Sequence, residues 1–294
     1  MLRFLALIVS MIALAGCSSV GRASPESGGA SGKPTYLCHK VQPGIRVDGK
    51  LDEPCWRRKP TLPLAGIADG STPLYGTTVR MVWNDEFLYL GAEIRDPAVW
   101  SRAALRDAEC GPEFAEHAST HRRSKNPEFH RFEADIMSYD KFIKFILDPD
   151  GDERNYIEFH VNAINNVFDA YWPQGFREKW GDRELEPNVK WSLPGLITAT
   201  RVEGTLNAPH DEDKGWNLEM ALPWSSLGSF ATGACPPKVG DVWTAHLGRI
   251  HQNSPRSGKI YWTWPVIGQV NCHLPHTYGR VVFADESGGT TGKR

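Results

Sequence analysis

Apolar and polar side chains alternate along much of the chain with the period of a β-strand. In residues 88–94 the apolar side chains at every second position share one face, while Tyr89 and Glu93 point to the other. Together with the run 79–83 and the turn 84–86, this pattern predicts a hairpin with one buried face. Similar runs predict further strands at 141–147, 156–161, 167–172, 197–203, 215–222, 242–250 and 280–283.

Signals for helices are few. The strand expected at 215–222 ends at Pro223, which cannot continue a central strand, and a short helical turn is expected at 224–227. Residues 102–133 are charged, rich in histidine and poor in alternation, so we expect an inserted loop with a short helix at 112–120. Closely spaced strands with little helix predict an all-β sandwich or jelly roll.

The first residues have the layout of a cleaved export signal. Arg3 precedes the apolar run 4–15, which is too short to span a bilayer comfortably, and Leu14-Ala15-Gly16-Cys17 closes it. This ending resembles a lipobox. We therefore expect a signal peptide at 1–16 and a lipid on Cys17; an ordinary signal peptide cut at another small residue is the alternative.

The rest of the chain divides into a tether, one domain and a tail. Residues 17–34 are rich in Ser, Gly and Ala and predict a flexible linker, because they have too little apolar bulk to offset the entropy of folding. A single domain is expected at 35–285 and a disordered tail at 286–294. The domain is expected to be exported and lipid-anchored, in the periplasm or at the cell surface. Ser18 in place of Asp favours the outer membrane if the host is Gram-negative.

Composition narrows the class of ligand. The formal net charge of −2 offers no basic surface for nucleic acid. The chain holds 11 Trp, 8 Tyr and 12 Phe, which suit both cores and ligand platforms. An odd number of cysteines follows Cys17, none spaced as CxxC, so at least one is unpaired and the pairing stays open. They are Cys38, Cys55, Cys110, Cys235 and Cys272.

Six motifs in a fixed order resemble the family 9 carbohydrate-binding modules, across nearly the whole chain after the linker. They include VDGKLDEP at 47–54 followed by Trp56, FILDPDGD at 145–152 and GWNLEMALPW at 215–224. The others are 83–90 with 93–97, 239–243 with Arg249 and 261–264, and 271–279. The likeness is closest to single-domain exported members of a looser, family 9-like branch. It implies a two-sheet antiparallel β-sandwich (jelly-roll or immunoglobulin-like), non-catalytic sugar binding in polysaccharide capture or catabolism, and often structural calcium.

The chain departs from the family pattern at the sugar site. In the family's appended modules two tryptophans sandwich a terminal sugar. Here Ser138 and Tyr139 stand at one of these positions, and no Trp lies near Cys272 at the other. An acidic residue of the family's third block falls at Lys144, which reverses the charge. The resemblance therefore predicts the fold and leaves the sugar open.

Saccharide sites combine an aromatic face with polar groups that reach the sugar hydroxyls. The candidates are aromatic side chains on expected loops or strand ends and polar side chains near them: Trp100, Tyr139, Trp172, Trp180, Arg177 and His273. For each aromatic ring, packing in the core is the alternative. A core position is the expectation for Trp56, Trp216, Trp224, Trp243, Trp262 and Trp264.

Two groups of residues are candidates for a metal ion. Asp148, Asp150 and Asp152 supply the clustered carboxylates that Ca²⁺ prefers. They lack EF-hand spacing, and a hairpin turn whose Asp side chains cap backbone amides is the alternative. In the insert, His117, His121, Glu113 and His130 suit a transition metal or a charged surface loop. No organic cofactor is expected.

Catalysis has little support in the sequence, and no catalytic residue is assigned. GxSxG, HExxH, GxGxxG and the P-loop are all absent. A glycoside hydrolase would need two carboxylates that face each other across a cleft. Glu158, Asp169 and Glu219 are the candidates, although each is expected to point outward into solvent.

Two further functions compete with sugar binding. Related sandwiches carry haem for electron transfer, and the candidate ligands here are Met137, His246, His251 and His273. Alternatively, the domain is a cell-surface scaffold whose insert at 102–133 binds another protein.

Overall fold

A computed structural model describes residues 32–42, 44–58, 60–101, 140–175, 188, 191–208, 210–254 and 257–290. The chain separates into two compact units, Met1–Gly32 and Lys33–Arg294, and the architecture below belongs to the second. The expected signal peptide, Cys17 and the insert at 102–133 lie outside the described residues. No helix within the described ranges is both long and apolar enough to cross a bilayer.

The second unit consists mostly of β-strands. They are β1 (Thr35–Lys40), β2 (Ala65–Gly66), β3 (Thr77–Trp83), β4 (Phe87–Arg95), β5 (Phe142–Asp148), β6 (Tyr156–Asn162), β7 (Val167–Trp172), β8 (Ile197–Glu203), β9 (Gly215–Pro223), β10 (Val242–His251), β11 (Ile260–Trp264) and β12 (Gly279–Ala284). The helical elements are α3 (Trp224–Leu227) and the 3₁₀ turns η1 (Pro54–Arg57), η2 (Gly228–Phe230) and η3 (Pro275–Thr277).

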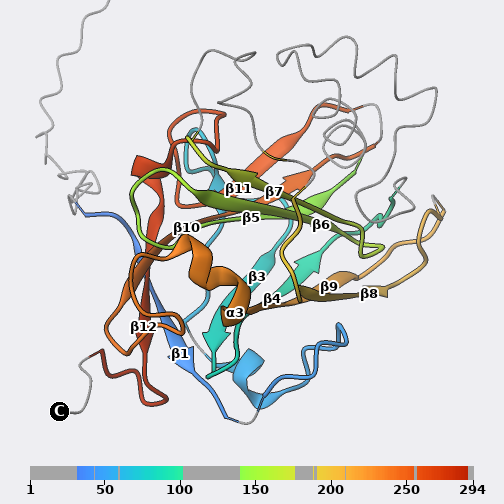
Figure 1. Cartoon of the computed structure of the whole chain (residues 1–294). Coiled ribbons are helices and arrows are strands. Elements are labelled where there is room, and N and C mark those ends of the chain that lie inside the picture. The colour runs from blue at the N-terminus through green and yellow to red at the C-terminus, as the bar shows by residue number, and fades with distance from the viewer. Residues whose placement is uncertain are drawn as a thin grey trace, which may run out of the picture. The chain divides into compact units, whose positions relative to one another are not determined.

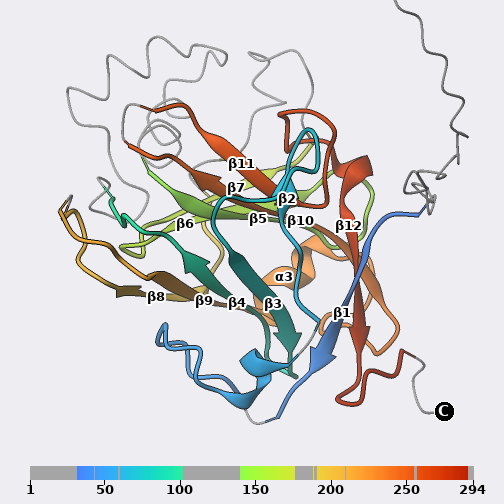
Figure 2. The same cartoon turned by 180° about the vertical axis from the view of Figure 1, so that it is seen from behind.

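The long strand β10 joins two layers. The strands pair in the order β7-β6-β5-β10-β12-β1-β3-β4-β9-β8, and β11 pairs with β10 and β2. Along one edge β10 pairs first with β12 and then with β11, while β5 lies along its other edge. The sheet therefore curls over, with β5, β6, β7 and β11 in one layer and β3, β4, β8 and β9 in the other (Figures 1 and 2). The predicted β-sandwich is confirmed.

The main core lies between these layers. It takes alternate side chains from both, such as Leu88 and Leu90 of β4 and Phe145 and Leu147 of β5. The tryptophans expected in the core are all buried. Five belong to the main core: Trp216, Trp224, Trp243, Trp262 and Trp264. Trp56 lies instead in a smaller cluster with Val82, Tyr89 and Ala221, on the other face of β3, β4 and β9.

The strands expected from the alternation are all present to within a few residues, and the helical turn at 224–227 is α3. β1 and β2 were not expected. β1 pairs in parallel with both β12 and β3, in a sheet that is otherwise antiparallel. Within the expected tail, Ser287 and Gly289 donate backbone hydrogen bonds to the Asp285 carboxylate, which closes a turn.

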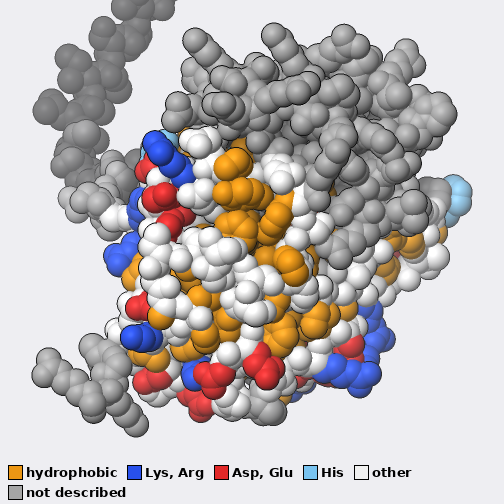
Figure 3. Space-filling view, viewed as in Figure 1, with side chains coloured by type: hydrophobic (Ala, Val, Ile, Leu, Met, Phe, Trp, Pro, Cys, Tyr) orange, Lys and Arg blue, Asp and Glu red, His pale blue; other side chains and the backbone are white. Residues whose placement is uncertain are grey.

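The surface of the second unit carries both signs of charge. Figure 3 shows apolar side chains gathered in the middle of the visible face, with acidic and basic side chains along its left side and lower edge. The large apolar side chains that are exposed include Leu74, Val266 and Val270.

Candidate functional site

The face of β5 and β6 that points away from the core carries buried polar side chains. Side chains alternate across a strand, so Phe145 and Leu147 face the core, whereas Lys144 faces away. On β6, Glu158 and His160 share this outer face, because Lys144 pairs with His160 and Ile146 with Glu158. These polar side chains are buried, although an outer face would ordinarily meet water.

The flanking strands extend the same face. β7 places Trp172 opposite Tyr156, and β10 places His246 opposite Ile146. The ring planes of Tyr156 and Trp172 are stacked, with centroids 5.7 Å apart. The face therefore combines aromatic rings with charged groups.

Glu158 is the centre of this arrangement. Its Oε1 lies 2.6 Å from Lys144 Nζ and 2.7 Å from His160 Nε2. Its Oε2 accepts a hydrogen bond of 2.8 Å from the indole N–H of Trp172. Only 3% of the Glu158 side chain is exposed, so these partners replace nearly all of its water.

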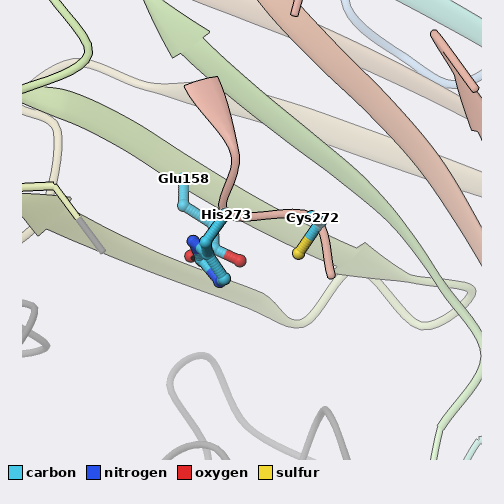
Figure 4. A group of neighbouring side chains, drawn as sticks. All are labelled: Glu158, Cys272 and His273. Carbon is cyan, nitrogen blue, oxygen red and sulfur yellow. Dashed lines mark ion pairs between the residues drawn. The ribbon is translucent and has the colours of Figure 1, made fainter. Parts of the chain in front are cut away.

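The segment before η3 covers this face and adds two part-exposed side chains, Cys272 and His273. Cys272 Sγ lies 3.2 Å from Lys144 Nζ, and His273 Nδ1 lies 3.1 Å from the Tyr156 hydroxyl. In Figure 4 the His273 ring lies across the Glu158 carboxylate and the sulfur points toward it. We call Lys144, Tyr156, Glu158, His160, Trp172, Cys272 and His273 the Glu158 cluster.

Local hydrogen bonds fix the covering segment. Asn271 Oδ1 accepts the backbone N–H of His273, and the Thr277 hydroxyl donates to the Leu274 carbonyl. The hydroxyl of Tyr278, a fully buried residue, donates to the Cys272 carbonyl. The positions of Cys272 and His273 therefore follow from a tight turn anchored by one buried tyrosine.

The charges of the cluster are strongly coupled. Burial alone would raise the pKa of Glu158, but Lys144, His273 and His160 hold that pKa well below its usual range. Burial would also raise the pKa of the Cys272 thiol, yet His273 and Lys144 outweigh it and lower the pKa to about 7. The cluster thus holds an ionised carboxylate and a thiol that is ready to lose its proton.

The pKa values of the imidazoles on this face are shifted in opposite directions. Burial and the Lys144 charge lower the pKa of His160 to about 4 and that of His246 to about 3, so both rings are neutral at pH 7. Burial opposes protonation of His273 as well, but Cys272 and Glu158 reverse the balance and raise its pKa. His273 is therefore the imidazole that most readily carries a positive charge here.

The structure brings together two of the residues expected to bind sugar. Trp172 and His273 lie with ring centroids 4.3 Å apart. Trp172 is buried rather than on an open loop, and its indole N–H is used by Glu158. Tyr139, Arg177 and Trp180 lie outside the described residues. Sequence reasoning did not single out Lys144, His160 or Cys272 as site residues, although polar positions two apart on β6 were the signal that could have found the face.

Trp100, the other described aromatic candidate, belongs to a different group of charges. Lys141 Nζ lies 5.1 Å from the centroid of the Trp100 ring and 2.7 Å from Asp96 Oδ2. Asp96 also lies near Arg249 and His251, at the far ends of β4 and β10. Trp100 is therefore separate from the Glu158 cluster.

The expectation that Glu158, Asp169 and Glu219 point into solvent is wrong, because all three are buried and hydrogen-bonded. Asp169 accepts from the Ser192 hydroxyl and the Leu193 backbone N–H. Glu219 accepts from the backbone N–H of Asp48 and Gly49 and from the Trp56 indole. Both faces of β6 and β9 are buried, so the side chains that point away from the core also lie out of contact with solvent.

In the acidic turn after β5, the three aspartates lie close together and also accept backbone hydrogen bonds. Oxygens of Asp148, Asp150 and Asp152 lie within 4.8 Å of one another. At the same time each carboxylate accepts a backbone N–H within the turn. Burial raises the pKa of Asp148 to about 7, and the neighbouring Asp150 and Asp152 carboxylates add to the rise.

The histidines of the insert and Met137 lie outside the described residues. Of the other candidate haem ligands, His246 and His251 are an odd number of positions apart on β10 and so point to opposite faces. These two side chains cannot bind the same iron. The four described cysteines, Cys38, Cys55, Cys235 and Cys272, are all free thiols.

Comparison with solved structures identifies the architecture. A family 9 carbohydrate-binding module from Caldicellulosiruptor kristjanssonii, in complex with cellotriose, matches with a TM-score of 0.50 and 14% identity, covering 88% of this chain and 98% of the module. A Bacteroides uniformis protein described as carbohydrate-binding matches with a TM-score of 0.54 and 15% identity, covering 86% and 100%. The domain has a family 9-like fold. No family model matches the sequence, and no curated protein does.

Within this family 9-like fold, two departures from the family pattern meet. The sequence has Lys144 where the family has an acidic residue, and Cys272 near the place of one sugar-binding tryptophan. Their side chains are in contact in the Glu158 cluster. Lys144 and Cys272 therefore place a positive charge and a thiol side by side in one cluster.

Proposed function

We propose that this chain binds a saccharide without cleaving it, at the Glu158 cluster. The observation that carries the proposal is the contact of Trp172 and His273 over the Glu158 carboxylate, in a family 9-like fold. Aromatic rings beside oriented polar groups are what a sugar ring and its hydroxyls require. Cys272 and His273 are part-exposed, so the cluster reaches the surface at the covering segment.

Binding fits the charges better than hydrolysis does. A general acid of a glycoside hydrolase holds its proton near neutral pH, which requires a raised pKa. The pKa of Glu158 is lowered instead, by Lys144 and two histidines. Asp169 and Glu219 are each committed to backbone and side-chain donors elsewhere. An ionised Glu158 is suited to accept hydrogen bonds from sugar hydroxyls.

The test is calorimetric titration of the purified chain with cellotriose and a panel of neutral and acidic oligosaccharides. Trp172→Phe removes the indole N–H that holds Glu158 while keeping an aromatic ring, so it should weaken binding by about tenfold. Trp216→Phe is the matched control, because Trp216 is equally buried but lies in the main core. Equal affinity in both variants, or no binding by the native chain to any sugar, would refute the proposal.

The acidic turn after β5 is the proposed calcium site. Asp148, Asp150 and Asp152 fit the ion in donor type and spacing, and the buried Asp148 carboxylate has no cation beside it among the described residues. Bound calcium would supply positive charge to these carboxylates and hold the β5–β6 hairpin.

Lipidation of Cys17 and export are further parts of the proposal, supported by the sequence 14–17 and the linker after it. A lipid at the N-terminus would hold the domain at a membrane surface, where it would capture polysaccharide for catabolism. Mass spectrometry of the N-terminal peptide tests this: a diacylglyceryl group on Cys17 is expected, and a processed N-terminus without lipid would overturn it.

A further inference from the structure

Three side chains of the Glu158 cluster offer three kinds of metal-binding atom. The carboxylate of Glu158, the thiol of Cys272 and the imidazole of His273 lie within 4.8 Å of one another (Figure 4). Sulfur, nitrogen and oxygen from three residues form a donor set that suits Zn²⁺, and a fourth position then remains for water or another ligand. We infer that Glu158, Cys272 and His273 form a binding site for zinc or a similar divalent transition metal.

The surroundings of the donors are those of oriented metal ligands. The Tyr156 hydroxyl contacts His273 Nδ1, while Nε2 lies 3.8 Å from Glu158 Oε2. When Nδ1 donates its proton to the Tyr156 oxygen, Nε2 keeps its lone pair toward Glu158. The carboxylate is itself held by the Trp172 indole and by His160. Partners of this kind fix the tautomer and direction of ligands in metal sites.

His246 provides an independent indication. It is fully buried on the same outer face, opposite Ile146, and neither of its ring nitrogens has a hydrogen-bond partner in the described part of the chain. A buried imidazole without a partner is costly. Water ordered by a cation bound at the cluster would supply hydrogen-bond partners to these ring nitrogens and remove part of that cost.

The Lys144 ammonium group opposes metal binding at this site. Its Nζ lies 2.6 Å from Glu158 Oε1 and 3.2 Å from Cys272 Sγ, so its ammonium group now occupies the space that these donors share. A divalent cation must displace this group, and the thiol must give its proton to solvent. Lys144 therefore sets the affinity of the site, and the site binds metal more tightly without it.

Because the loss of Lys144 should strengthen zinc binding, the test includes a gain of affinity, which a misfolded variant cannot produce. The full chain in detergent, with a phosphine reductant, is titrated with ZnCl₂ by calorimetry and with Co²⁺ by absorption spectroscopy. One ion per chain is expected, with a thiolate–Co²⁺ charge-transfer band. Lys144→Met should bind zinc at least about tenfold more tightly than the native chain, and Cys272→Ser, His273→Gln and Glu158→Gln at least about tenfold more weakly.

Cys235→Ser is the matched control, since Cys235 is another part-buried free thiol that lies outside the cluster, where its Sγ donates to the Trp224 carbonyl. It should leave the zinc affinity and the Co²⁺ band unchanged. The inference is overturned if neither the native chain nor Lys144→Met binds zinc, or if Cys272→Ser keeps the charge-transfer band. Zinc is measured without sugar, so the result is independent of the proposed saccharide binding.

Discussion

Lys144 Nζ lies 3.2 Å from Cys272 Sγ, and this contact joins two of the positions at which the sequence departs from the family 9 pattern that it resembles. A positive charge on β5 thus lies against a thiol on the segment that covers it. The same ammonium group neutralises Glu158 on β6. One buried carboxylate and one ammonium group therefore link β5, β6 and the covering segment.

Replacing Lys144 with Met should destabilise the chain by about 3–5 kcal/mol, because Glu158 would remain buried without its closest cation. Lys144→Met with Glu158→Gln should cost less than the sum of the two single changes. Urea unfolding in the presence of EDTA measures both. Lys40→Met, which removes an exposed pair with Asp85, is the control and should cost less than about 1 kcal/mol. Equal costs for Lys144→Met and Lys40→Met would contradict this prediction.

Glu219 should be structural, in contrast to Glu158. Its carboxylate ties the 47–54 motif to β9 by accepting the N–H groups of Asp48 and Gly49 and the Trp56 indole. Glu219→Ala leaves these buried donors unpaired and should cost about 2–4 kcal/mol in urea unfolding. Zinc and saccharide affinities, measured on the folded variant, should not change. A loss of either affinity would show that the motif serves the site as well as the fold.

Acid should destabilise the fold through its buried histidines. Burial and the Arg249 charge lower the pKa of His251 to about 4 from an ordinary 6.5. Between these values the unfolded chain binds more protons than the folded chain, so the free energy of unfolding falls as pH falls from 6.5 to 4. Each such histidine contributes a slope of up to about 1.4 kcal/mol per pH unit.

His251→Phe keeps a ring against Trp262 but cannot titrate. Urea unfolding at several pH values between 4 and 7 should therefore show a shallower slope for this variant than for the native chain. The slope that remains in this variant is expected from His160 and His246, whose pKa values are also lowered. An unchanged slope in His251→Phe would mean that His251 is not neutral in the fold.

Calcium should stabilise the β5–β6 hairpin if the acidic turn binds it. At a concentration of about one hundred times the dissociation constant, the free energy of unfolding should rise by about 2.7 kcal/mol. Asp152→Asn should abolish the rise in melting temperature, whereas Asp85→Asn, in the turn between β3 and β4, should not. If calcium does not change the melting temperature of the native chain, the prediction is wrong and the aspartates serve only to accept backbone hydrogen bonds.

The alternation of side chains predicted the strands because a half-buried sheet imposes that period on its sequence. β2 has only two residues and gives no period, and β1 lies next to the linker, where its alternation of Tyr36 and Cys38 is short. The order of the strands was not contained in these patterns. The resemblance implied the sandwich but no strand order, and periodicity fixes which face is buried without saying which strand lies alongside.

The site was harder to predict than the fold for a related reason. A polar residue at an outward position is expected to meet water, so Glu158 was placed in solvent. What buries it is the covering segment at 271–278, more than one hundred residues later in the chain. His273 is among the residues expected to bind sugar, and its contacts with Trp172 and Tyr156 place it in the Glu158 cluster.

β1 lies between β12 and β3, so the first strand of the domain is completed by the last one. When a chain is delivered from its N-terminus onward, β1 can pair only with β3 until residues 279–284 have arrived. The sandwich therefore closes only when residues 279–284 are available to pair with β1.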